Sequence, residues 1–455
     1  MSEEQTVDLV VAGAGGGLVA ALRAAELGLE VLVVEASEHY VRGNNTAMST
    51  AMLPGAGTRW QVEAGIDDDP DVFVEDMVRK THGDVDRALA RALAVVSGEL
   101  VTWLVDHVGV PLDLVTDFQY PGHSRLRCHT LPGRSGSHLL HALVDAVAAQ
   151  DQITVLVPAR LTDVTVDDGA VTVEVTTPDG QTERIGTRAV LLATNGYGAD
   201  PGLVREHVPE IADATYYGSP ESTGDALRIG GRLGAGTAYL DAYQGHAALC
   251  GAAGTLVGWA TVMHGGYLVD AAGARFADET VGYSEFAHLT LARAAQGRAS
   301  IVLDQRVHDA CMVFDDFRHT VESGALRWAD TVDELAERLG VDPEALAATM
   351  AGATAAARGE AEDQLGRTDW EQPLAPPYAG VHVEPALFHT QGGLRVDGHA
   401  RVLDTKGAPI VGVYASGGAA MGTSGHGAAG YLAGNGLLPA LGLAYLAAGD
   451  VAGAR

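Results

Sequence analysis

The chain has 455 residues, of which 47% are hydrophobic, and a formal net charge of −30 at pH 7. That length and apolar content suffice for two or three domains with packed cores, whereas the negative charge disfavours nucleic acids and anionic membranes as partners. Three dispersed cysteines, an odd number without CxxC spacing, argue against a disulfide framework, a structural zinc or an iron–sulfur cluster.

The two ends of the sequence bear on its location. The acidic start, MSEEQTVD, lacks the basic and apolar regions of a signal peptide. No uninterrupted apolar stretch reaches eighteen residues, and the nearest, Leu437–Ala448, is typical of a buried helix. We therefore expect a cytoplasmic protein without a membrane span. Because His-x-x-x-His patterns are absent, no metal site is predicted.

A dinucleotide-binding pattern opens the chain at Thr6–Ser37. An apolar run, a glycine cluster, an Ala/Leu-rich helical pattern and a second apolar run ending in Glu35 form a βαβ fingerprint. Gly13 allows the tight turn, Gly15 lets backbone approach a pyrophosphate, and the next helix supplies free N–H groups and partial positive charge. Glu35 is placed to accept hydrogen bonds from an adenosine ribose. Leu18 occupies the third-glycine position of G-x-G-x-x-G, so the loop looks one residue short.

The first half continues with helical patterns and then with strands. Helical patterns reach about residue 108, and the loop Thr116–Gly136 that follows carries Tyr120 and several basic side chains. A helix is predicted at Ser137–Gln150, and another after the Gly-Asp turn within Ser222–Gly236. Apolar or alternating runs predict strands at Ile153–Val157, Leu161–Val166, Ala170–Thr176 and Ala189–Ala193.

The sequence changes character at about Gln244. Charged helical patterns and a proline-rich crossing fill the stretch up to Val381, after which apolar strands and glycine turns return at His389–Gly436. We expect an α/β protein with a discontinuous Rossmann-like domain and an inserted α+β cap domain that binds substrate. The predicted ranges are 1–243 and 382–455 for the Rossmann-like domain and 244–381 for the cap.

Four segments together resemble the flavoprotein superfamily of fumarate reductases and 3-ketosteroid dehydrogenases. They are the N-terminal unit ending at Glu35, Ala189–Gly198 (AVLLATNGYG), Ser222–Ala226 (STGDA) and His389–Gly436, which includes GVYASGG. The resemblance implies that the Rossmann-like domain binds FAD. Covalently flavinylated members carry a histidine in the run that corresponds to Arg42–Thr50. Here Gly, Asn and Thr stand in those positions, which implies non-covalent FAD.

The resemblance also implies which segments contact FAD. The Ala-Thr-Asn-Gly strand end accompanies the adenylate half, and GVYASGG brings backbone against the flavin. The final helix points its positive end at the pyrimidine edge of the isoalloxazine, where it stabilises negative charge. The implied cofactor-binding residues are Gly13, Gly15, Gly16, Gly17, Glu35, Ala36, Gly43, Asn44, Asn45, Thr46, Ala193, Thr194, Asn195, Gly196, Asp225, Gly417, Gly418, Asn435, Gly436 and Leu437.

Two branches of the superfamily differ after the RFADE motif at Arg275–Glu279. Reductases carry a proton-delivering arginine there and further arginines that clamp the dicarboxylate. This chain has Tyr283 in that place, and the final-helix arginine is missing from Gly425–Gly436. Since arginine is hard to replace in a bidentate carboxylate clamp, fumarate reduction is disfavoured. The pattern is closer to ketosteroid-type 1,2-dehydrogenases.

In that branch the resemblance implies Tyr283 as the base that removes the proton α to a ketone, with Tyr120 assisting. Tyr431 and the backbone N–H of Gly434 hold the ketone oxygen, where enolate charge develops. The flavin accepts the β-hydride. For Tyr283 the alternative is an interface tyrosine packed between the two domains.

Candidate substrate-binding residues are Phe118, Arg125, Arg127 and His389. The arginines belong to a basic loop that either binds a carboxylate or a flavin phosphate, or forms salt bridges with nearby acids. His389 resembles a histidine that touches substrate carboxylate in the reductases, and the alternative is a structural hydrogen-bonder. The compact cap indicates a substrate smaller than a steroid, such as an oxocyclohexanecarboxylate.

These observations predict an FAD-dependent dehydrogenase that introduces a double bond α,β to the ketone of a small cyclic substrate. The alternatives are an enoate reductase or dicarboxylate dehydrogenase, and a flavin redox partner without small-molecule chemistry of its own. Since no second dinucleotide fingerprint occurs, the electron acceptor is expected among quinones, oxygen and protein carriers. The sequence specifies neither that acceptor nor the oligomeric state.

Overall fold

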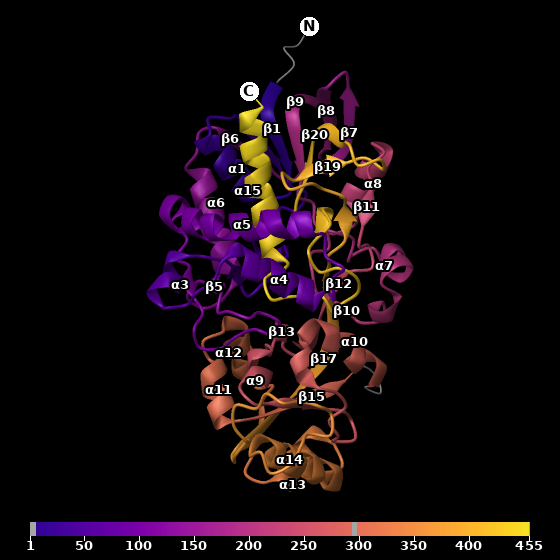
Figure 1. Cartoon of the computed structure of the whole chain (residues 1–455). Helices are drawn as coiled ribbons and strands as arrows, with labels where there is room; N and C mark the ends of the chain where they lie inside the picture. The colour runs from indigo at the N-terminus through magenta and orange to yellow at the C-terminus, as the bar shows by residue number, and fades with distance from the viewer. Residues whose placement is uncertain (1–5, 294–297, 455) are drawn as a thin grey trace. The chain divides into compact units, whose positions relative to one another are not determined.

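The computed structural model describes residues 6–293 and 298–454. The chain divides into two compact units, whose elements are labelled in Figure 1. Unit 1 comprises Met1–Val208, Gly218–Tyr243 and His389–Arg455. Unit 2 comprises Pro209–Tyr217 and Gln244–Phe388.

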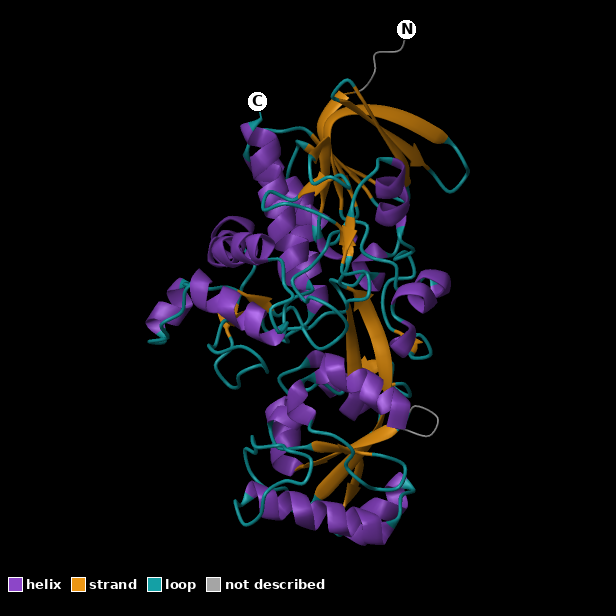
Figure 2. Cartoon of the chain, turned by 45° about the vertical axis from the view of Figure 1, so that its right-hand side comes forward, coloured by secondary structure: helices purple, strands orange, loops and turns teal. Residues whose placement is uncertain are grey.

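Unit 1 is built on a sheet with the strand order β19-β20-β9-β1-β2-β6. Figure 2 draws the strands of the chain in orange. Its central strands are parallel, as in a doubly wound dinucleotide fold. All four residues of β2 are buried, which is typical of a parallel strand covered on both faces. The strands are β1 (Thr6–Ala12), β2 (Val31–Val34), β6 (Ile153–Leu156), β9 (Thr182–Leu192), β19 (Arg401–Leu403) and β20 (Pro409–Ala415), and β9 also pairs with the hairpin of β7 (Arg160–Asp167) and β8 (Ala170–Thr176).

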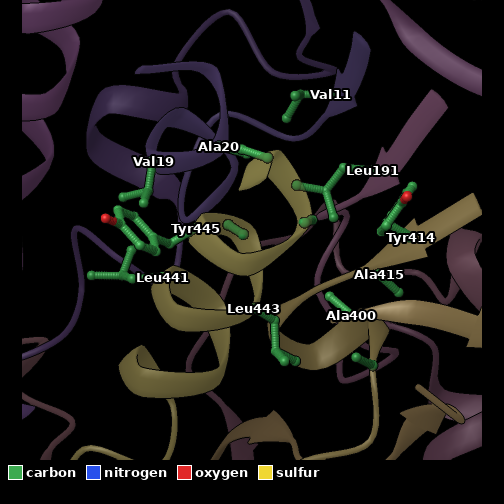
Figure 3. Close-up of a cluster of buried hydrophobic side chains, with 14 of the residues drawn as sticks. Val11, Val19, Ala20, Leu191, Ala400, Tyr414, Ala415, Leu441, Leu443 and Tyr445 are labelled. Carbon is green, nitrogen blue, oxygen red and sulfur yellow. The ribbon is translucent and has the colours of Figure 1, made fainter. Parts of the chain in front are cut away.

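The last helix of the chain lies in the core of unit 1. Helix α15 (Leu437–Gly453) packs along α1 (Gly17–Glu26) and α5 (Arg87–Trp103). Figure 3 shows Leu441 of α15 beside Val19 of α1 in one buried apolar cluster. Because α15 is apolar on all sides, it is stable only when surrounded in this way.

Shorter elements complete unit 1. One continuous helical run, Arg87–Val108, is long and apolar enough to cross a membrane by length and composition, and 56% of its apolar window is buried inside the protein, as in a core helix. The remaining elements are α2 (Tyr40–Gly43), β3 (Leu53–Pro54), α3 (Arg59–Glu63), α4 (Pro70–Lys80), the π-helical turn η1 (Leu104–Val108), β4 (Asp113–Leu114), β5 (Cys128–Thr130), α6 (Gly136–Ala148), α7 (Pro201–His207), α8 (Asp225–Arg232), β11 (Thr237–Ala238), β18 (Gly393–Leu394) and η5 (Gly417–Ala419).

Unit 2 contains a second sheet with the strand order β13-β12-β17-β15-β14, and β10 and β16 also pair with β17. Its helices cover a core that includes Val269, Leu335 and Leu346. The strands are β10 (Thr215–Tyr216), β12 (Tyr243–Cys250), β13 (Thr255–Leu256), β14 (Tyr267–Val269), β15 (Ala299–Asp304), β16 (Arg327–Ala329) and β17 (Tyr378–Thr390). The helices are η2 (Pro209–Ile211), α9 (Ala260–Met263), η3 (Glu279–Val281), α10 (Tyr283–Arg293), α11 (Gln305–Cys311), α12 (Asp315–Glu322), α13 (Val332–Leu339) and α14 (Pro343–Ala357).

The observed division differs from the predicted ranges at two places. The predicted break at 381/382 falls inside β17, and the chain passes between the units at Phe388 and His389 instead. The short segment Pro209–Tyr217 also belongs to unit 2, because β10 pairs with β17. Both differences come from strand pairing between segments far apart in the sequence. The start of the insertion, at Gln244, is where the sequence places it.

Candidate functional site

The glycine loop between β1 and α1 leaves no room for side chains. Gly13 has a φ of +112°, and a Cβ there would lie 2.3 Å from the carbonyl oxygen of Ala193. A Cβ on Gly17, the first residue of α1, would lie 2.6 Å from Val11 Cγ1. Gly17 thus provides the close helix–strand packing that the third glycine of the fingerprint normally provides. The loop is therefore complete although Leu18 occupies the expected position.

Glu35 lies at the end of β2 beside the glycine loop. Its Oε2 accepts a hydrogen bond from the Ala14 amide at 2.7 Å, and its Oε1 accepts one from the Ser37 amide at 2.8 Å. Burial raises the pKa of the Glu35 carboxyl, and the two amide donors oppose that shift. Each carboxylate oxygen has a second lone pair with which to accept a ribose hydroxyl.

The polar run after β2 folds over the glycine loop. Asn44 donates from Nδ2 to the Ala14 carbonyl at 3.2 Å, and Thr46 Oγ1 lies 3.0 Å from the place of a Cβ on Gly15. Asn45 Oδ1 accepts a hydrogen bond from the Ser219 amide at 2.8 Å. These contacts bring Asn44 and Thr46 to the loop that the fingerprint assigns to a pyrophosphate, and they attach Asn45 to Ser219.

The turns that follow β9 and β20 meet at the carboxyl edge of the sheet. A Cβ on Gly418 would lie 2.5 Å from Asn195 Oδ1. Asn195, at a φ of +62°, donates from Nδ2 to Ser222 Oγ at 2.8 Å. Ala440 of α15 lies against both Gly16 and Gly417. The three predicted cofactor segments, at residues 13–17, 193–196 and 417–418, therefore converge with the start of α15.

Asp225 begins helix α8, and its buried carboxylate forms ion pairs with Arg160 and Arg228. Arg160 also pairs with Glu221. This network attaches α8 to the β7 strand. The predicted contact between Asp225 and the cofactor stays a prediction.

The loop that carries Tyr120 lies against the segment before α15. His123 donates from Nε2 to the Ala433 carbonyl at 3.0 Å, and a Cβ on Gly122 would lie 2.5 Å from Leu432 Cδ2. Burial raises the pKa of Tyr120 well above its ordinary value, and the phenol of Tyr431 adds to the shift. Tyr120 therefore stays protonated at neutral pH, in the neighbourhood of Tyr431.

Two further predicted residues lie in the same region. The ring of Phe118 makes an edge contact with Tyr120, with the ring centroids 4.7 Å apart. Gly434 has a φ of +92°, and a Cβ there would lie 2.3 Å from Pro54 Cδ. Phe118 thus contacts Tyr120, and the loop that carries both lies against Leu432 and Ala433, between Tyr431 and Gly434 in the chain.

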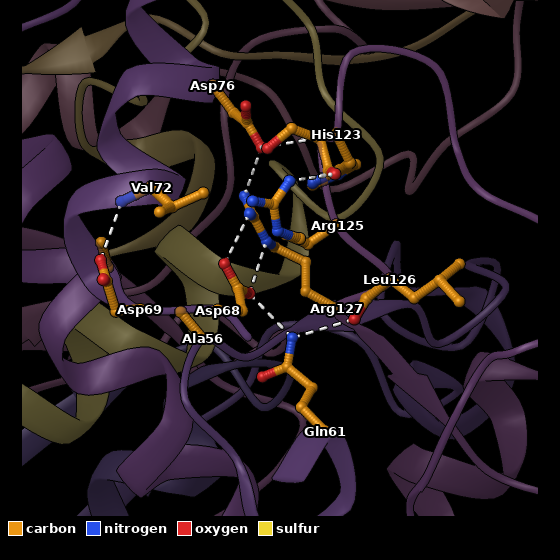
Figure 4. Close-up of polar contacts among 12 residues, drawn as sticks. Ala56, Gln61, Asp68, Asp69, Val72, Asp76, His123, Arg125, Leu126 and Arg127 are labelled. Carbon is orange, nitrogen blue, oxygen red and sulfur yellow. Dashed lines mark hydrogen bonds and ion pairs between the residues drawn. The ribbon is translucent and has the colours of Figure 1, made fainter. Parts of the chain in front are cut away.

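The predicted substrate-binding role of Arg127 is wrong. Its side chain is fully buried, and all three of its guanidinium nitrogens are engaged by carboxylates (Figure 4). Nε and Nη2 donate to Asp68 at 3.0 and 2.8 Å, and Nη1 lies 2.8 Å from Asp76 Oδ2. The guanidinium also lies over the ring of Phe73. With both carboxylates as its ion-pair partners, the salt-bridge alternative holds for Arg127.

Arg125 and His389 both contact neighbouring groups of the protein, and the substrate-binding role of Arg125 stays a prediction. Arg125 is exposed and donates to the backbone carbonyls of Asp67 and Ser124. His389 contacts the Thr390 carbonyl through Nδ1 and the amide of Gln391 through Nε2. Burial lowers the pKa of His389 to about 4. At neutral pH it offers no positive charge to a carboxylate, which favours the structural alternative.

In unit 2 the Arg-Phe-Ala-Asp-Glu motif is a buried ion-pair network. Glu279 is inaccessible to solvent and pairs with Arg275 at 2.7 Å and with Arg367 at 3.5 Å. Arg275 also pairs with Asp363 at 2.6 Å. The network fixes the η3 turn, from which α10 begins directly at Tyr283.

The Tyr283 ring is held in an aromatic stack. His246 stacks on Tyr283 with the ring centroids 4.7 Å apart, and its other face stacks on Phe388 at 5.2 Å. Trp259 makes an edge contact with Tyr283. Burial lowers the pKa of His246 to about 3, so the stacked imidazole is neutral. Sequence reasoning missed this stack, because its members lie far apart in the chain.

Comparison with known proteins assigns the chain to a family. Residues 8–437 match the family described as FAD binding domain. The chain belongs to the FAD binding domain family. Its cofactor is FAD, and it is an FAD-dependent oxidoreductase.

Two curated relatives bear on the chemistry of this flavoprotein. NADH:fumarate oxidoreductase of Klebsiella pneumoniae is 27% identical over 91% of the chain, which spans only 44% of that protein. The 4-oxocyclohexanecarboxylate 2-dehydrogenase of Sinomonas cyclohexanicum is 28% identical, and the alignment covers 98% of the chain and 93% of the dehydrogenase.

Solved flavoenzymes share the fold. A flavocytochrome c3 fumarate reductase in its open conformation has a TM-score of 0.80 and 26% identity, covering 99% of the chain and 78% of the reductase. The 3-ketosteroid Δ1-dehydrogenase of Sterolibacterium denitrificans has a TM-score of 0.77 and 20% identity, covering 99% of the chain and all of the dehydrogenase. The predicted superfamily and the α/β fold class are therefore confirmed, whereas the preference for one branch remains a proposal.

The residues of unit 1 fit FAD. Of the buried side-chain polar atoms that have no hydrogen-bond partner within residues 6–293 and 298–454, four lie in or beside the predicted cofactor segments, as expected where a polar ligand supplies the partner. They belong to the strand end after β9, the turn after β20 and the two sides of the loop before α15, and they are Thr194 Oγ1, Ser416 Oγ, Thr423 Oγ1 and Asn435 Oδ1. In the described part of the chain no group of three or more His, Cys, Asp or Glu could hold a metal ion. Ser416 and Thr423 were missed from the sequence, since a lone hydroxyl carries no pattern.

Proposed function

We propose that the protein desaturates a small cyclic ketone of the 4-oxocyclohexanecarboxylate type, forming the α,β-unsaturated ketone. The observation that carries the proposal is Tyr283, which follows the Glu279 network directly at the start of α10, in the place where the reductases carry arginine. The relative that matches this chain almost end to end is named for this reaction class, which supports the proposal.

Each tyrosine has a role in the proposed reaction. Tyr283 removes the α-proton, and its ring is held for this task by the stack on His246. Tyr120 is held protonated by burial, so it does not act as a second base; it relays the abstracted proton by accepting it and releasing its own. Tyr431 and the Gly434 N–H donate to the ketone oxygen as enolate charge develops. FAD held by unit 1 would supply the acceptor for the β-hydride.

Recognition of the substrate carboxylate rests on fewer residues than the sequence indicated. Arg127 is engaged by Asp68 and Asp76, so it takes no part. Phe118 and the exposed Arg125 remain candidates within the Tyr120 loop. The support for a carboxylated ring comes from the Sinomonas relative rather than from a basic pocket.

Steady-state kinetics with an artificial dye acceptor test the substrate class. We expect kcat/KM for 4-oxocyclohexanecarboxylate to exceed that for cyclohexanone by at least about 10-fold, because a site built for a charged group rejects substrates that leave it unpaired. A steroid ketone serves as the bulky comparison and should react more slowly. Equal kcat/KM values with and without the carboxylate would refute this substrate class.

The second candidate is an enoate reductase of the same family. Two relatives support this candidate, because both the Klebsiella protein and the flavocytochrome are named for the reduction of fumarate. The flavocytochrome also has a TM-score of 0.80 to this chain. The absence of arginine from Gly425–Gly436 and the tyrosine at position 283 oppose it. Reduction of fumarate by the dye-reduced enzyme, measured in the same assay, distinguishes the two candidates.

A further inference from the structure

A chain of hydrogen-bonded side chains leads from His389 to the start of α15. Gln391 Nε2 lies 3.1 Å from His389 Nε2, and Ser424 Oγ lies 2.8 Å from Gln391 Oε1. Asn435 Nδ2 lies 3.1 Å from Ser424 Oγ. Gln391, Ser424 and Asn435 are at most 4% exposed, so the chain is shielded from water.

The direction of every hydrogen bond in this chain follows from its first member. His389 Nδ1 lies 3.1 Å from the Thr390 carbonyl, and a carbonyl only accepts, so Nδ1 carries the proton. Because the ring is neutral, Nε2 must accept, and Gln391 must donate to it from its amide nitrogen. Gln391 Oε1 then accepts from the Ser424 hydroxyl.

The last member of the chain is left with an acceptor. Once the Ser424 hydroxyl proton is committed to Gln391, Ser424 Oγ accepts from Asn435 Nδ2. Asn435 Oδ1 is thereby turned away from Ser424, and this buried atom has no partner within residues 6–293 and 298–454. Asn435 stands two residues before helix α15, whose N-terminus carries partial positive charge.

We propose that Asn435 Oδ1 accepts a hydrogen bond from the N3–H of the FAD isoalloxazine, and that His389, Gln391 and Ser424 are positioning residues that keep the amide in this orientation. N3–H is the donor that the pyrimidine edge of an oxidised flavin presents. The adenosine hydroxyls are assigned to Glu35, at the far end of the dinucleotide pattern. The inference rests on FAD as the cofactor and holds for either candidate substrate class.

Reconstitution of the full-length apoprotein with two cofactors tests this assignment. FAD and an FAD methylated at N3 differ at that donor, and their dissociation constants are measured from flavin fluorescence. We expect the wild-type protein to bind FAD at least about 10-fold more tightly, because the methylated cofactor leaves Asn435 unpaired. In Asn435→Leu this preference should fall at least about threefold, because only its steric part remains.

Leucine is chosen because it removes the acceptor without making room for the methyl group. A preference for FAD that is undiminished in Asn435→Leu would therefore show steric exclusion alone and overturn the proposal, as would equal binding by the wild-type protein. If the Asn435→Leu apoprotein fails to fold by circular dichroism, Ser424→Ala takes its place. It releases the amide, so the preference should fall at least about threefold, and an unchanged preference would overturn the proposal. None of these measurements depends on turnover.

Discussion

Replacing Tyr283 with phenylalanine should lower kcat for desaturation by about 10²- to 10⁴-fold, the usual contribution of a positioned general base. Phenylalanine keeps the ring that stacks on His246 at 4.7 Å, so the hydroxyl alone is lost. The ion pairs of Glu279 that fix the preceding turn are also untouched. Steady-state turnover with 4-oxocyclohexanecarboxylate and a dye acceptor measures the effect, and the FAD dissociation constant should not change.

Tyr378→Phe is the matched control for this variant. Tyr378 is also a half-buried tyrosine of unit 2, but it packs on the separate cluster that contains Leu335 and Leu346. Its replacement should leave turnover within about twofold of the wild-type value, since exposed or half-exposed substitutions away from a site have small effects. Comparable losses in the two variants, or full activity in Tyr283→Phe, would argue that the Tyr283 hydroxyl is not the base.

Replacing Arg127 with methionine should lower the free energy of unfolding by about 3–5 kcal/mol, because it removes the ion-pair partner of the buried Asp68 carboxylate and leaves Asp76 with Arg79 alone. Asp68 and Asp76 are at most 1% exposed at the side chain. Asp76 also holds the Tyr120 loop through the Ser124 amide at 2.8 Å. Urea unfolding followed by circular dichroism measures the change.

The comparison variant is Arg125→Met, two residues away in the same loop. Arg125 is exposed and bonds only backbone carbonyls among its recorded contacts, so we expect a loss of no more than about 1 kcal/mol. Equal losses in the two variants would contradict the assignment of Arg127 to the buried ion-pair cluster.

The Arg127→Met effect should also depend on pH. Burial raises the pKa of the Asp76 carboxyl. The hydrogen bonds and positive charges of Ser124, Arg127 and Arg79 lower this pKa by more, so it lies below its ordinary value. A carboxyl whose pKa is lower in the folded than in the unfolded protein stabilises the fold at pH values above its unfolded-state pKa. This stabilisation is lost as the pH falls through the pKa of the folded state. The difference between wild type and Arg127→Met should therefore shrink below about pH 4.

The dinucleotide half of the protein was predictable because its signals are local. The spacing of apolar runs, glycines and Glu35 reports a βαβ unit, and that unit is observed. The prediction that the glycine loop is one residue short was wrong. The fold needs a glycine where the helix contacts the first strand, and the position of that glycine within the pattern matters less. Gly17 lies against Val11 and fulfils the packing requirement one residue early.

The role of the basic loop could not be predicted because it depends on partners distant in sequence. Arg127 meets Asp68 and Asp76 only after α4 and the Tyr120 loop fold together. The direction of the hydrogen bonds from His389 to Asn435 likewise needs four side chains and one carbonyl in fixed positions. A sequence pattern records residue types, whereas these roles are set by which partners each polar atom finds.

Anaerobic mixing of the oxidised FAD-loaded enzyme with 4-oxocyclohexanecarboxylate tests the central claim most directly. A ketone desaturase should lose the visible absorption of its oxidised flavin in a single turnover, with one equivalent of the unsaturated ketone formed. If the absorption stays constant while fumarate restores it in dithionite-reduced enzyme, the protein is an enoate reductase and the proposed desaturation is wrong.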